Sequence, residues 1–535
     1  MAFLFDPQQP VAVPNWTNFS GTVGPFDIPH FVHIPGDPNR VPNALEIHAN
    51  ALREVLEFCF SASTPRPLRT LGSTWSFSSV IEPEQVVVDP GAMFHVQGIP
   101  HEHWTDEYLE RARGGGFRPI FVEGGTGIGT LNDKLGRDGK LALQTSGAGN
   151  GHRMAGCIAT GTHGSALQIG ALHDTVLAMY LLISPDEAIL VQSNRDKTFK
   201  PSIADWLQEQ TKIPTRVEDG DLLLAAARVG LGSCGFVFAA IVEATGLYAF
   251  DIHRFKCDAN DPDVLHALQT LDTTRLHASS TGDTPYHFDV VMNPYPVGGK
   301  KNWFATVMYK RPVGDREFKG PLQGIPRTTV DTMGLVSSLV EIFGEGLLGE
   351  LTRAVVGGQI CDQLNGDADP PEDTLFPGQV FGPTTLPRGQ GASTEIAVDQ
   401  RHAQAALDTV HQVLRSEADK GNLLLGVIAM RFVGRTRSLL GMNQFDKTCF
   451  IELPSIDSPG VRSVFDAVWQ GLQDNNINFA CHWGQLGGFS PARTQAYYGE
   501  HASQWMEARA QLLKTDTAMA VFGAKILKQA GLDGG

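Results

Sequence analysis

The sequence predicts an α+β protein with two large parts of different character. Up to about residue 250, short apolar strands alternate with glycine-rich turns and few long helices. Beyond that point, longer strands alternate with amphipathic helices, which predicts an antiparallel sheet backed by helices. The chain has 535 residues, more than one simple core accommodates. We therefore expect domains over 1–250 and 251–480 and a C-terminal segment over 481–535.

The composition is that of an ordinary soluble globular protein, with 42% hydrophobic and 19% charged residues. A net charge of −16 argues against nucleic acid or an anionic membrane surface as a partner and suits a small neutral substrate. No apolar run approaches the roughly 20 residues that span a bilayer, and residues 1–10 lack the basic start of a signal peptide. We expect a cytoplasmic protein, in which the sequons at Asn15 and Asn18 are idle.

Seven cysteines are scattered along the chain, and none forms a Cys-x-x-Cys pair. An odd count without such a pair indicates neither a zinc site nor a disulfide framework, so we expect no metal. Most of the thiols are expected to be buried as small hydrophobes.

In the first part, residues 1 to about 40 are rich in Pro, Asn and Gly, which predicts an ordered arm rather than a helix. Apolar residues recur at helical spacing from Ala44 to Ser61. The turn over 124–135 superficially resembles a dinucleotide fingerprint, but Asp138 is too near to be the acidic residue expected about 20 positions on. The other expected elements are a strand and small-residue turn over 67–77, strands over 85–89 and 120–123, a helix and glycine turn over 222–236, and a strand over 237–243.

Between these elements lies a stretch with few bulky side chains, Ala155-Gly-Cys-Ile-Ala-Thr-Gly-Thr-His-Gly-Ser165. Main-chain N–H groups reach a ligand only where no Cβ intervenes, so such a run suits a diphosphate or a flat heterocycle. Taken alone, the stretch is equally typical of a glycine-rich loop between two strands.

In the second part, antiparallel strands are expected over 286–295 and 302–310. A Pro-, Asp- and Gly-rich run from Asn365 to Arg388 predicts a long surface loop, with a lid as one possible role. The remaining expected elements are a helix over 395–418, strands over 426–433 and 447–453, a helix over 461–474, and a mostly helical tail over 491–530.

Four segments, in this order and spacing, resemble the motifs of one flavoprotein family. They are Leu71-Gly-Ser-Thr-Trp-Ser-Phe77, Ala155 to Ser165, Gly232-Ser-Cys-Gly-Phe-Val237 and His482-Trp-Gly-Gln485. The chain resembles the vanillyl-alcohol-oxidase-type (PCMH-type) FAD flavoproteins, in the branch of alditol oxidases, aldonolactone oxidases and covalent-type cholesterol oxidases. The resemblance covers residues 12–250 well, the C-terminal end fairly and the middle loosely.

The resemblance implies a two-subdomain PCMH-type FAD-binding domain, a separate substrate domain and a C-terminal segment that returns to the first. It implies that the three glycine turns follow the FAD diphosphate, the isoalloxazine and the adenine side. Backbone N–H groups and short hydroxyls suit a diphosphate, although the hydroxyls alone could equally cap turns. The FAD contacts carried over by position are Leu71, Gly72, Ser73, Thr74, Trp75, Ser76, Cys157, Thr160, Gly161, Thr162, His163, Gly164, Ser165, Gly235 and Val237.

Trp75 is a departure from the family pattern. Many relatives carry a histidine at this position, and the flavin 8-methyl group alkylates that imidazole. The indole nitrogen has no free lone pair, so Trp75 cannot form this bond. We predict FAD bound without the 8α-histidyl link, with Trp75 packed against the dimethylbenzene ring. His163 and Cys157 are the alternative attachment points.

The resemblance implies hydride transfer from a CH–OH carbon to flavin N5, with a hydrogen-bonding or basic partner at the substrate oxygen and positive character near the flavin N1 and C2 carbonyl. Alditol-oxidase relatives supply these groups from a Glu-x-Arg strand and a His-Trp-Gly-Lys segment. Here the strand reads Ala429-Met-Arg431, and the segment ends in Gln485. We expect Arg431 to face the substrate oxygen or the flavin edge and Gln485 to donate a hydrogen bond to the flavin. His482 acts either as a base or as a turn cap.

The leading hypothesis is an FAD-dependent oxidase that acts on a small alcohol, sugar or lactone and returns electrons to O2 as H2O2. The missing carboxylate and ammonium weaken the case for a polyol and favour a bulkier alcohol, so a sterol or lipid alcohol oxidase stays open. A dehydrogenase with another electron acceptor and a catalytically silent flavoprotein are the remaining alternatives. His287 beside Asp289 is a lesser candidate for the site. The oligomeric state is left open.

Overall fold

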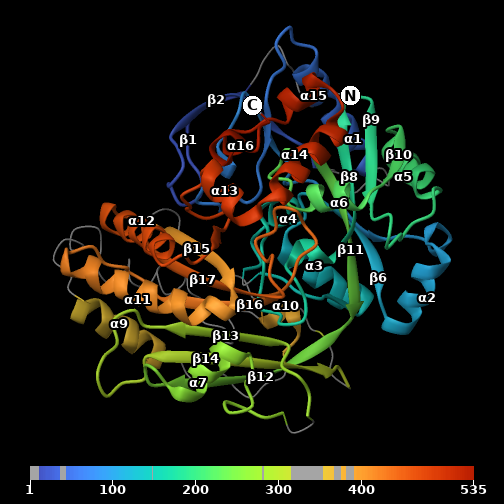
Figure 1. Ribbon diagram of the computed structural model, residues 1–535. Coiled ribbons are helices and arrows are strands. Elements are labelled where there is room, and N and C mark those ends of the chain that lie inside the picture. The colour runs from blue at the N-terminus through green and yellow to red at the C-terminus, as the bar shows by residue number, and fades with distance from the viewer. Residues whose placement is uncertain are drawn as a thin grey trace.

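The computed structural model describes residues 11–36, 44–147, 149–279, 282–314, 318, 353–366, 375–380 and 391–534. Its strands form three sheets, of which the third is made entirely by strands from Tyr248 onward (Figure 1). In Figure 1 this third sheet occupies the lower left, in yellow-green and orange, while the blue N-terminal and red C-terminal parts lie together at the top. The predicted α+β class is confirmed.

The first sheet is small and is built by the N-terminal arm together with the two strands that flank the first glycine turn, residues 71–77. Its strands are ordered β1-β2-β4-β3, with β1 and β2 antiparallel and β4 parallel to both of its neighbours. The arm predicted to be non-helical thus contributes two strands. The elements are β1 (Val11–Trp16), β2 (Phe26–His33), α1 (Ala44–Phe60), β3 (Leu68–Thr70) and β4 (Val86–Asp89).

The second sheet is ordered β10-β9-β8-β11-β6-β5, and β7 also pairs with β11. Its central strands are apolar along almost their whole length because helices cover them: α1 and α6 both pack on β8, and α4 packs on β11. The strands are β5 (Val96–Gly98), β6 (Arg118–Glu123), β7 (Leu141–Leu143), β8 (Val176–Ser184), β9 (Glu187–Gln192), β10 (Thr215–Asp219) and β11 (Phe236–Gly246). The helices are α2 (Asp106–Gly115), α3 (Ile128–Lys134), α4 (Met154–Thr160), α5 (Ile203–Thr211) and α6 (Asp221–Arg228).

The small-residue stretch over 155–165 is only partly a loop, which differs from both interpretations of its sequence. Its first half belongs to α4, which Gly161 ends in the left-handed conformation with φ +77°. The small side chains here allow close packing: a Cβ built on Gly72 would lie 3.8 Å from the Cα of Gly156. The stretch therefore brings a short helix, rather than an extended loop, against the first glycine turn.

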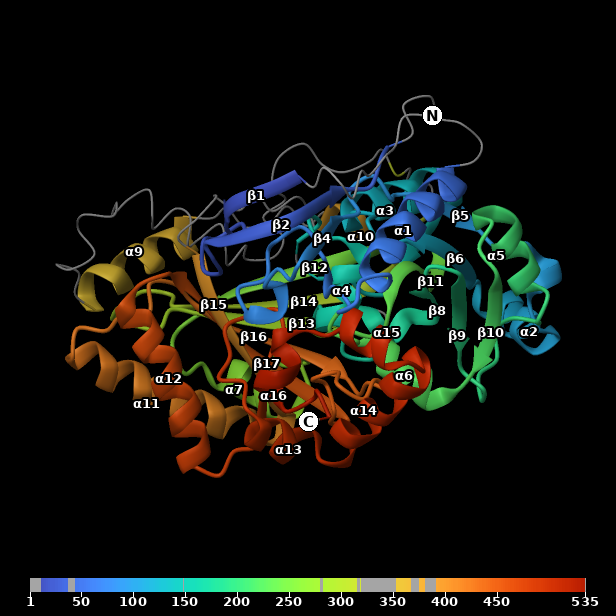
Figure 2. The ribbon, with the colours of Figure 1, turned by 90° about the horizontal axis from the view of Figure 1, so that it is seen from above.

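The third sheet is antiparallel throughout and ordered β12-β14-β13-β16-β17-β15-β18. Helices α11 and α12 lie side by side and share one apolar core with the sheet and α7, as expected for a sheet backed by helices (Figure 2). The strands are β12 (Tyr248–Cys257), β13 (His287–Met292), β14 (Trp303–Pro312), β15 (Gly391–Asp399), β16 (Ile428–Gly434), β17 (Lys447–Ile456) and β18 (Phe479–Cys481). The helices are α7 (Pro262–Thr270), α9 (Arg353–Gly366), α10 (Pro377–Val380), α11 (Ala403–Asp419) and α12 (Pro459–Asp474).

The helix predicted over 395–418 starts too early in the sequence. Residues 395–399 continue β15, which pairs with β17 from Gly391 to Asp399, and the helix begins only at Ala403. Ile396 and Val398 fit strand alternation as well as helical spacing, so the pairing with β17 decides the outcome. The long loop predicted over 365–388 lies mostly outside the described residues.

Four helices form the C-terminal end and pack on the first part of the chain. The Trp505 indole donates to the carbonyls of Ala226 and Val229, and Arg509 Nε donates to the Ser233 carbonyl at 2.8 Å. Among the described residues, no helix has the length and apolar character needed to cross a membrane. The helices are α13 (Pro491–Tyr498), α14 (Glu500–Leu513), α15 (Asp516–Val521) and α16 (Lys525–Ala530).

Candidate cofactor groove and charged cluster

The first glycine turn, α4 and the turn before β11 line one groove. Arg69, His152 and Arg153 also line it and were not predicted. Gly161, His163, Gly164 and Ser165 lie outside its lining. The predicted contacts found along the groove are Leu71, Gly72, Ser73, Thr74, Trp75, Ser76, Cys157, Thr160, Thr162, Gly235 and Val237.

The first glycine turn presents a row of unused hydrogen-bond donors to this groove. On either side, the Leu71 amide donates to the Val88 carbonyl at 2.9 Å and the Phe77 amide to the Gly484 carbonyl at 2.8 Å. Between them, the N–H groups of the segment 72–76 meet no acceptor in the described part of the chain. Backbone donors rarely stay without partners. A row of this kind suits the oxygens of a diphosphate.

One cation lies at the groove without a carboxylate partner among the described residues. The Arg69 guanidinium donates through Nε to the Val80 carbonyl at 3.1 Å and through Nη1 to the Gly232 carbonyl at 3.4 Å. Burial lowers the pKa of Arg69 to about 10, which keeps it charged at neutral pH. By contrast, Arg153 is paired with Asp89 at 2.5 Å. Arg69 therefore adds positive charge to a wall otherwise made of peptide donors.

Trp75 packs against the backbone of Gly151 at the groove. Its ring centroid lies 4.6 Å from that of His152, edge to face, and a Cβ on Gly151 would come within 2.2 Å of the indole. Burial raises the pKa of the Cys157 thiol to about 12, which makes this side chain a poor nucleophile at neutral pH. The packing thus disfavours Cys157 as an attachment point for a flavin.

A second feature is a buried cluster of charges at the centre of the third sheet. Arg431 Nη1 lies 2.6 Å from Glu452 Oε2 and 3.4 Å from Glu395 Oε1. Gln485 Nε2 donates to Glu452 Oε1 at 3.1 Å. The carboxylate that is missing from the strand 429–431 is therefore supplied twice, by the neighbouring strand β17 and by β15, the next strand beyond it. We correct the sequence-based expectation of a site without a carboxylate.

The charged groups of this cluster stabilise one another in their ionised forms. Burial alone would raise the pKa of Glu395, but contacts with His163 and Arg431 hold it down to about 2. Burial would likewise lower the pKa of Arg431, but Glu452 and Glu395 raise it above its usual value. Both groups are therefore ionised at neutral pH.

The segment 482–484 joins the cluster to the groove. A Cβ built on Gly484 would lie 3.3 Å from Ser76 Oγ, at the end of the groove, and 3.3 Å from His482 Cε1. The ring centroids of His482 and His163 are 5.8 Å apart. A flat ligand end that passes Ser76 would therefore meet the charged cluster.

His482 has the hydrogen bonds of a turn cap. Its Nδ1 accepts the Gly484 N–H at 3.0 Å, so the ring is neutral with its proton on Nε2. Burial lowers the pKa of His482 to about 4. With Nδ1 already in use and Nε2 protonated, the ring has no free lone pair with which to take a substrate proton. Of the two roles open for His482, the geometry favours the cap.

The substitution His482→Asn separates these two roles. An Asn oxygen can accept the same Gly484 N–H in an Asx turn, so we expect kcat within about tenfold of the parent enzyme, whereas loss of a base would cost about 100-fold or more. The unfolded histidine binds a proton at higher pH than the folded one. The free energy of unfolding of the parent protein should therefore decrease as the pH is lowered from about 6.5 to about 4, and it should decrease less in the variant. Turnover rates and melting temperatures across this pH range test both points.

Two other predicted residues have structural partners. Ser165 Oγ accepts the Phe432 N–H at 2.9 Å and donates to the Phe288 carbonyl, so it ties the loop after α4 to β16 and β13. His287 Nε2 lies 2.5 Å from Asp289 Oδ2, with both side chains buried.

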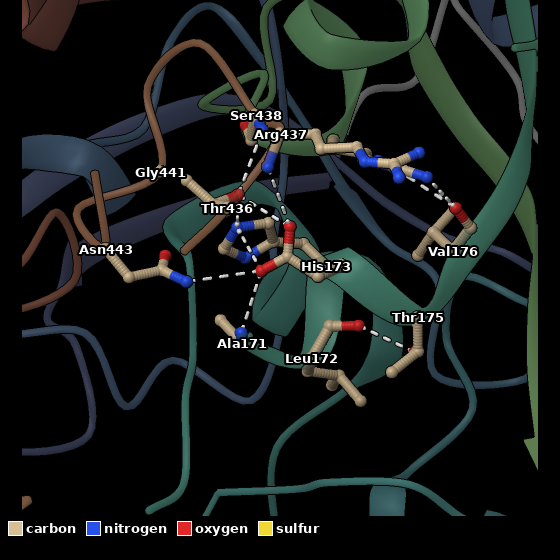
Figure 3. A network of polar contacts seen from close by, with 12 residues as sticks. Ala171, Leu172, His173, Thr175, Val176, Thr436, Arg437, Ser438, Gly441 and Asn443 are labelled. Atoms are coloured by element: carbon tan, nitrogen blue, oxygen red, sulfur yellow. Dashed lines mark hydrogen bonds and ion pairs between the residues drawn. The ribbon is translucent and has the colours of Figure 1, made fainter. Parts of the chain in front are cut away.

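A polar clamp, centred on Asp174, fixes the loop after β16 against the segment η4 (Leu172–Thr175) that precedes β8. Asp174 Oδ1 accepts from Thr436 Oγ1 at 2.6 Å and from the Arg437 N–H at 3.3 Å. Its Oδ2 accepts from the Ala171 N–H at 2.8 Å and from Asn443 Nδ2 at 3.3 Å. Figure 3 shows these donors converging from two distant parts of the chain. The clamp thereby holds the strand that carries Arg431 in register with the loop that follows α4.

We expect Asp174→Ala to destabilise the folded protein by about 3 kcal/mol, because several hydrogen bonds to a nearly buried carboxylate are lost together. Thermal or denaturant unfolding of the full chain measures this loss. Asp466→Ala, on the exposed side of α12, is the matched control and should stay within about 0.5 kcal/mol of the parent. Equal unfolding transitions for the two variants would show that the clamp does not contribute to the stability of the folded protein.

Sequence reasoning missed the two carboxylates and Arg69. Glu395 was assigned to a helix, and its approach to Arg431 depends on the order of β16, β17 and β15. Glu452 did carry a signal: a single carboxylate in the apolar run Cys449-Phe-Ile-Glu-Leu453 is a buried charge that needs a partner. Arg69, flanked by Leu68 in a short strand, carried the same signal.

Neither a protein-family model nor a curated protein sequence matches this chain. Solved structures do match. The crystal structure of cholesterol oxidase from B. sterolicum superimposes with a TM-score of 0.67 at 12% identity, covering 99% of this chain and 100% of that one. A histidine-to-alanine variant of Brevibacterium sterolicum cholesterol oxidase gives 0.65 at 12% identity over 98% of each chain. A solvent-stable cholesterol oxidase gives 0.64 at 12% identity over 98% of this chain and 99% of that one. The chain therefore shares the fold of these oxidases.

Proposed function

We propose that the protein is an FAD-dependent oxidase that oxidises a CH–OH group and passes the electrons to O2, which forms H2O2. The observation that carries this proposal is the row of unused amide donors over 72–76, which leads along a groove to the buried cluster around Arg431. The shared fold with cholesterol oxidases supports it.

The residues of the groove fit an FAD molecule. The amides of the first glycine turn and the charge of Arg69 would hold the diphosphate, and the end of the groove at Ser76 would direct the flavin ring toward the cluster. FAD, when bound, supplies the hydride acceptor for alcohol oxidation. We propose residues 1–250 and the C-terminal segment 481–535 as the FAD-binding part, and 251–480 as the substrate-binding part.

Within the cluster, Arg431 is a guanidinium whose orientation is fixed by two carboxylates. Its remaining N–H groups can donate to the oxygen of a substrate alcohol, where negative charge develops as the hydroxyl proton leaves. Gln485, held by Glu452, can donate to a neighbouring carbonyl. Glu452, the carboxylate that both of these side chains contact, would itself receive the hydroxyl proton.

A second candidate concerns the substrate. We proposed a small alcohol, sugar or lactone from the sequence; a bulkier and less polar alcohol is favoured by the neutral Gln485, in place of an ammonium, and by the shared fold with cholesterol oxidases. The two candidates use the same Arg431 and differ only in the shape and polarity of the substrate pocket.

The test is anaerobic mixing of the purified protein with a panel of polyols, sugars, lactones and sterols. We expect at least one substrate class to bleach the flavin absorbance, and O2 to restore it with release of H2O2. Bleaching without peroxide on reoxidation would indicate a dehydrogenase. No bleaching with any substrate would indicate a silent flavoprotein.

The mode of FAD attachment has its own test. Because Trp75 cannot form the histidyl bond and Cys157 is held as a buried thiol, we expect acid precipitation to leave the yellow colour in the supernatant. Colour that remains in the pellet would contradict this expectation.

A further inference from the structure

We propose that the loop 18–23, between β1 and β2, positions the amide row of the first glycine turn, and that Asn18 is the positioning residue on which this depends. This inference rests on the flavin-binding function proposed above, because it explains how the unused donors over 72–76 come to face the groove. Asn18 lies outside the lining of the groove, so it acts through the backbone of the turn.

The loop holds carbonyl groups of the turn. The Phe19 N–H donates to the Thr74 carbonyl at 2.9 Å, and Asn18 Nδ2 donates to the Ser76 carbonyl at 2.8 Å. A trans peptide is planar, with its C=O and its N–H on opposite sides. Because the Thr74 carbonyl points at the loop, the N–H of Trp75 in the same peptide points away from it. This N–H is one of the unused donors of the amide row.

Asn18 is buried, 3% exposed, and both polar atoms of its side chain have partners. Its Oδ1 accepts the Val23 N–H at 3.0 Å, while Nδ2 also lies 2.9 Å from Thr22 Oγ1 and 3.0 Å from Ser20 Oγ. The main-chain N–H of Asn18 donates to the Val23 carbonyl at 3.0 Å, which closes the loop. The Val23 N–H needs an acceptor and the Ser76 carbonyl needs a donor, so the amide of Asn18 has one orientation. The loop and the turn are therefore joined as one unit.

Thr74 is held in a conformation that is unfavourable for its side chain. Its φ of +59° lies in the left-handed region, where a β-branched residue is strained. Such a conformation persists only where the surrounding structure fixes it, and the hydrogen bond from the Phe19 N–H fixes the Thr74 carbonyl. Thr74 stands at the centre of the amide row. The loop thus maintains the backbone geometry on which the row depends.

Asn18 also orients the junction between the groove and the charged cluster. The peptide between Ser76 and Phe77 accepts from Asn18 through its carbonyl and donates to the Gly484 carbonyl through its N–H, at 2.8 Å. These two groups lie on opposite sides of one plane. By fixing the carbonyl, Asn18 therefore aims the N–H that holds the segment leading to the cluster.

The experiment measures FAD binding to the apoprotein of Asn18→Asp at about pH 8, by fluorescence quenching. The carboxylate keeps the size of the amide and can still accept the Val23 N–H, but it repels the Ser76 carbonyl instead of donating to it. We expect the dissociation constant for FAD to rise about 30-fold, with the circular dichroism spectrum of the parent. A dissociation constant within about threefold of the parent would overturn the proposal.

Asn302→Asp is the matched control. Asn302 is likewise 3% exposed and holds a loop of the third sheet, where it accepts the Val297 N–H at 2.8 Å and donates to the Val297 carbonyl at 2.9 Å. The same substitution there should lower the melting temperature but leave the dissociation constant for FAD within about twofold of the parent. Equal weakening of FAD binding in the two variants would show that Asn18 acts only through general stability, and the proposal would fail.

Thr74→Gly tests the strain in the turn. Glycine adopts a positive φ without steric cost, so this variant should melt at a higher temperature than the parent. Combined with Asn18→Asp, it should lower the raised dissociation constant for FAD by about fivefold, because the turn then depends less on the loop. A melting temperature of Thr74→Gly at or below that of the parent, or no recovery of affinity in the double variant, would contradict the role of the loop.

If Asn18→Asp does not fold, Thr22→Val answers the same question with a smaller change. Valine has the shape of threonine but lacks the hydroxyl that donates to the Phe77 carbonyl at 3.3 Å and accepts from Asn18. We expect FAD binding about fivefold weaker than in the parent. Unchanged binding in a folded Thr22→Val variant would overturn the proposal.

The two proposals can fail separately, because the melting temperature of Thr74→Gly is measured without flavin. A parent protein that takes up no FAD would contradict the proposed function, while the strain at Thr74 could still be measured. A parent that binds FAD, with an Asn18→Asp variant that binds it equally well, would contradict this inference alone.

Discussion

Replacing Arg431 by Gln should lower kcat about a thousandfold, the cost of removing a preorganised donor from a developing negative charge. The effect should be large because Arg431 is the partner of two carboxylates, Glu452 at 2.6 Å and Glu395 at 3.4 Å. Without it, two like charges remain close together, so one carboxylate takes up a proton and the hydrogen bonds of Gln485 change as well. Steady-state kinetics of variants with equal FAD content measure the loss.

Two further variants make this test specific. Arg431→Lys keeps the charge but not the planar fork, so it should recover only part of the activity. Arg435→Gln removes a guanidinium from the same segment, where the side chain is exposed and paired with Asp446, and should leave kcat unchanged. Activity of Arg431→Gln within tenfold of the parent would show that Arg431 does not contact the reacting oxygen.

Replacing Gly72 by Phe should weaken FAD binding at least about 100-fold, or roughly 2.7 kcal/mol. A Cβ at this position would meet only the Gly156 Cα, at 3.8 Å, so the backbone tolerates a side chain. An aromatic ring there would occupy the groove in front of the unused amides. Titration of the apoprotein with FAD, followed by fluorescence quenching, measures the affinity.

The controls for this variant separate blocking from unfolding. Gly72→Ala adds one methyl group and should weaken binding much less than Phe. Gly98→Phe places the same aromatic ring at an exposed position in β5, where a Cβ meets nothing within 4 Å, and should leave FAD affinity unchanged. If Gly72→Phe binds FAD as tightly as Gly98→Phe does, the groove is not the cofactor site.

The sequence allowed a good prediction of the groove because its determinants are local. The turn 71–76 and the segment around Gly156 are marked by missing side chains, which are visible in the sequence itself. The two glycines lie close to each other, with the Gly156 Cα 3.8 Å from the position that a Gly72 Cβ would take. The short helix α4 was not anticipated, because glycine and alanine are compatible with both a helix and a loop.

The charged cluster could be predicted only in part, because its geometry is set by long-range strand pairing. Arg431 was identified from its own strand, but its partners Glu395 and Glu452 come from β15 and β17. Which strands become neighbours is decided by the packing of the whole sheet. The position of Glu395 was also hard to predict, because the spacing of the apolar residues around it fits a helix and a strand equally well.

The most direct test of the account is the visible absorption spectrum of the purified protein, before and after incubation of the apoprotein with FAD. We expect one FAD per chain, with the flavin bands at their protein-bound positions and release of the colour on acid denaturation. A protein that is colourless as purified and takes up no FAD on reconstitution would contradict the account.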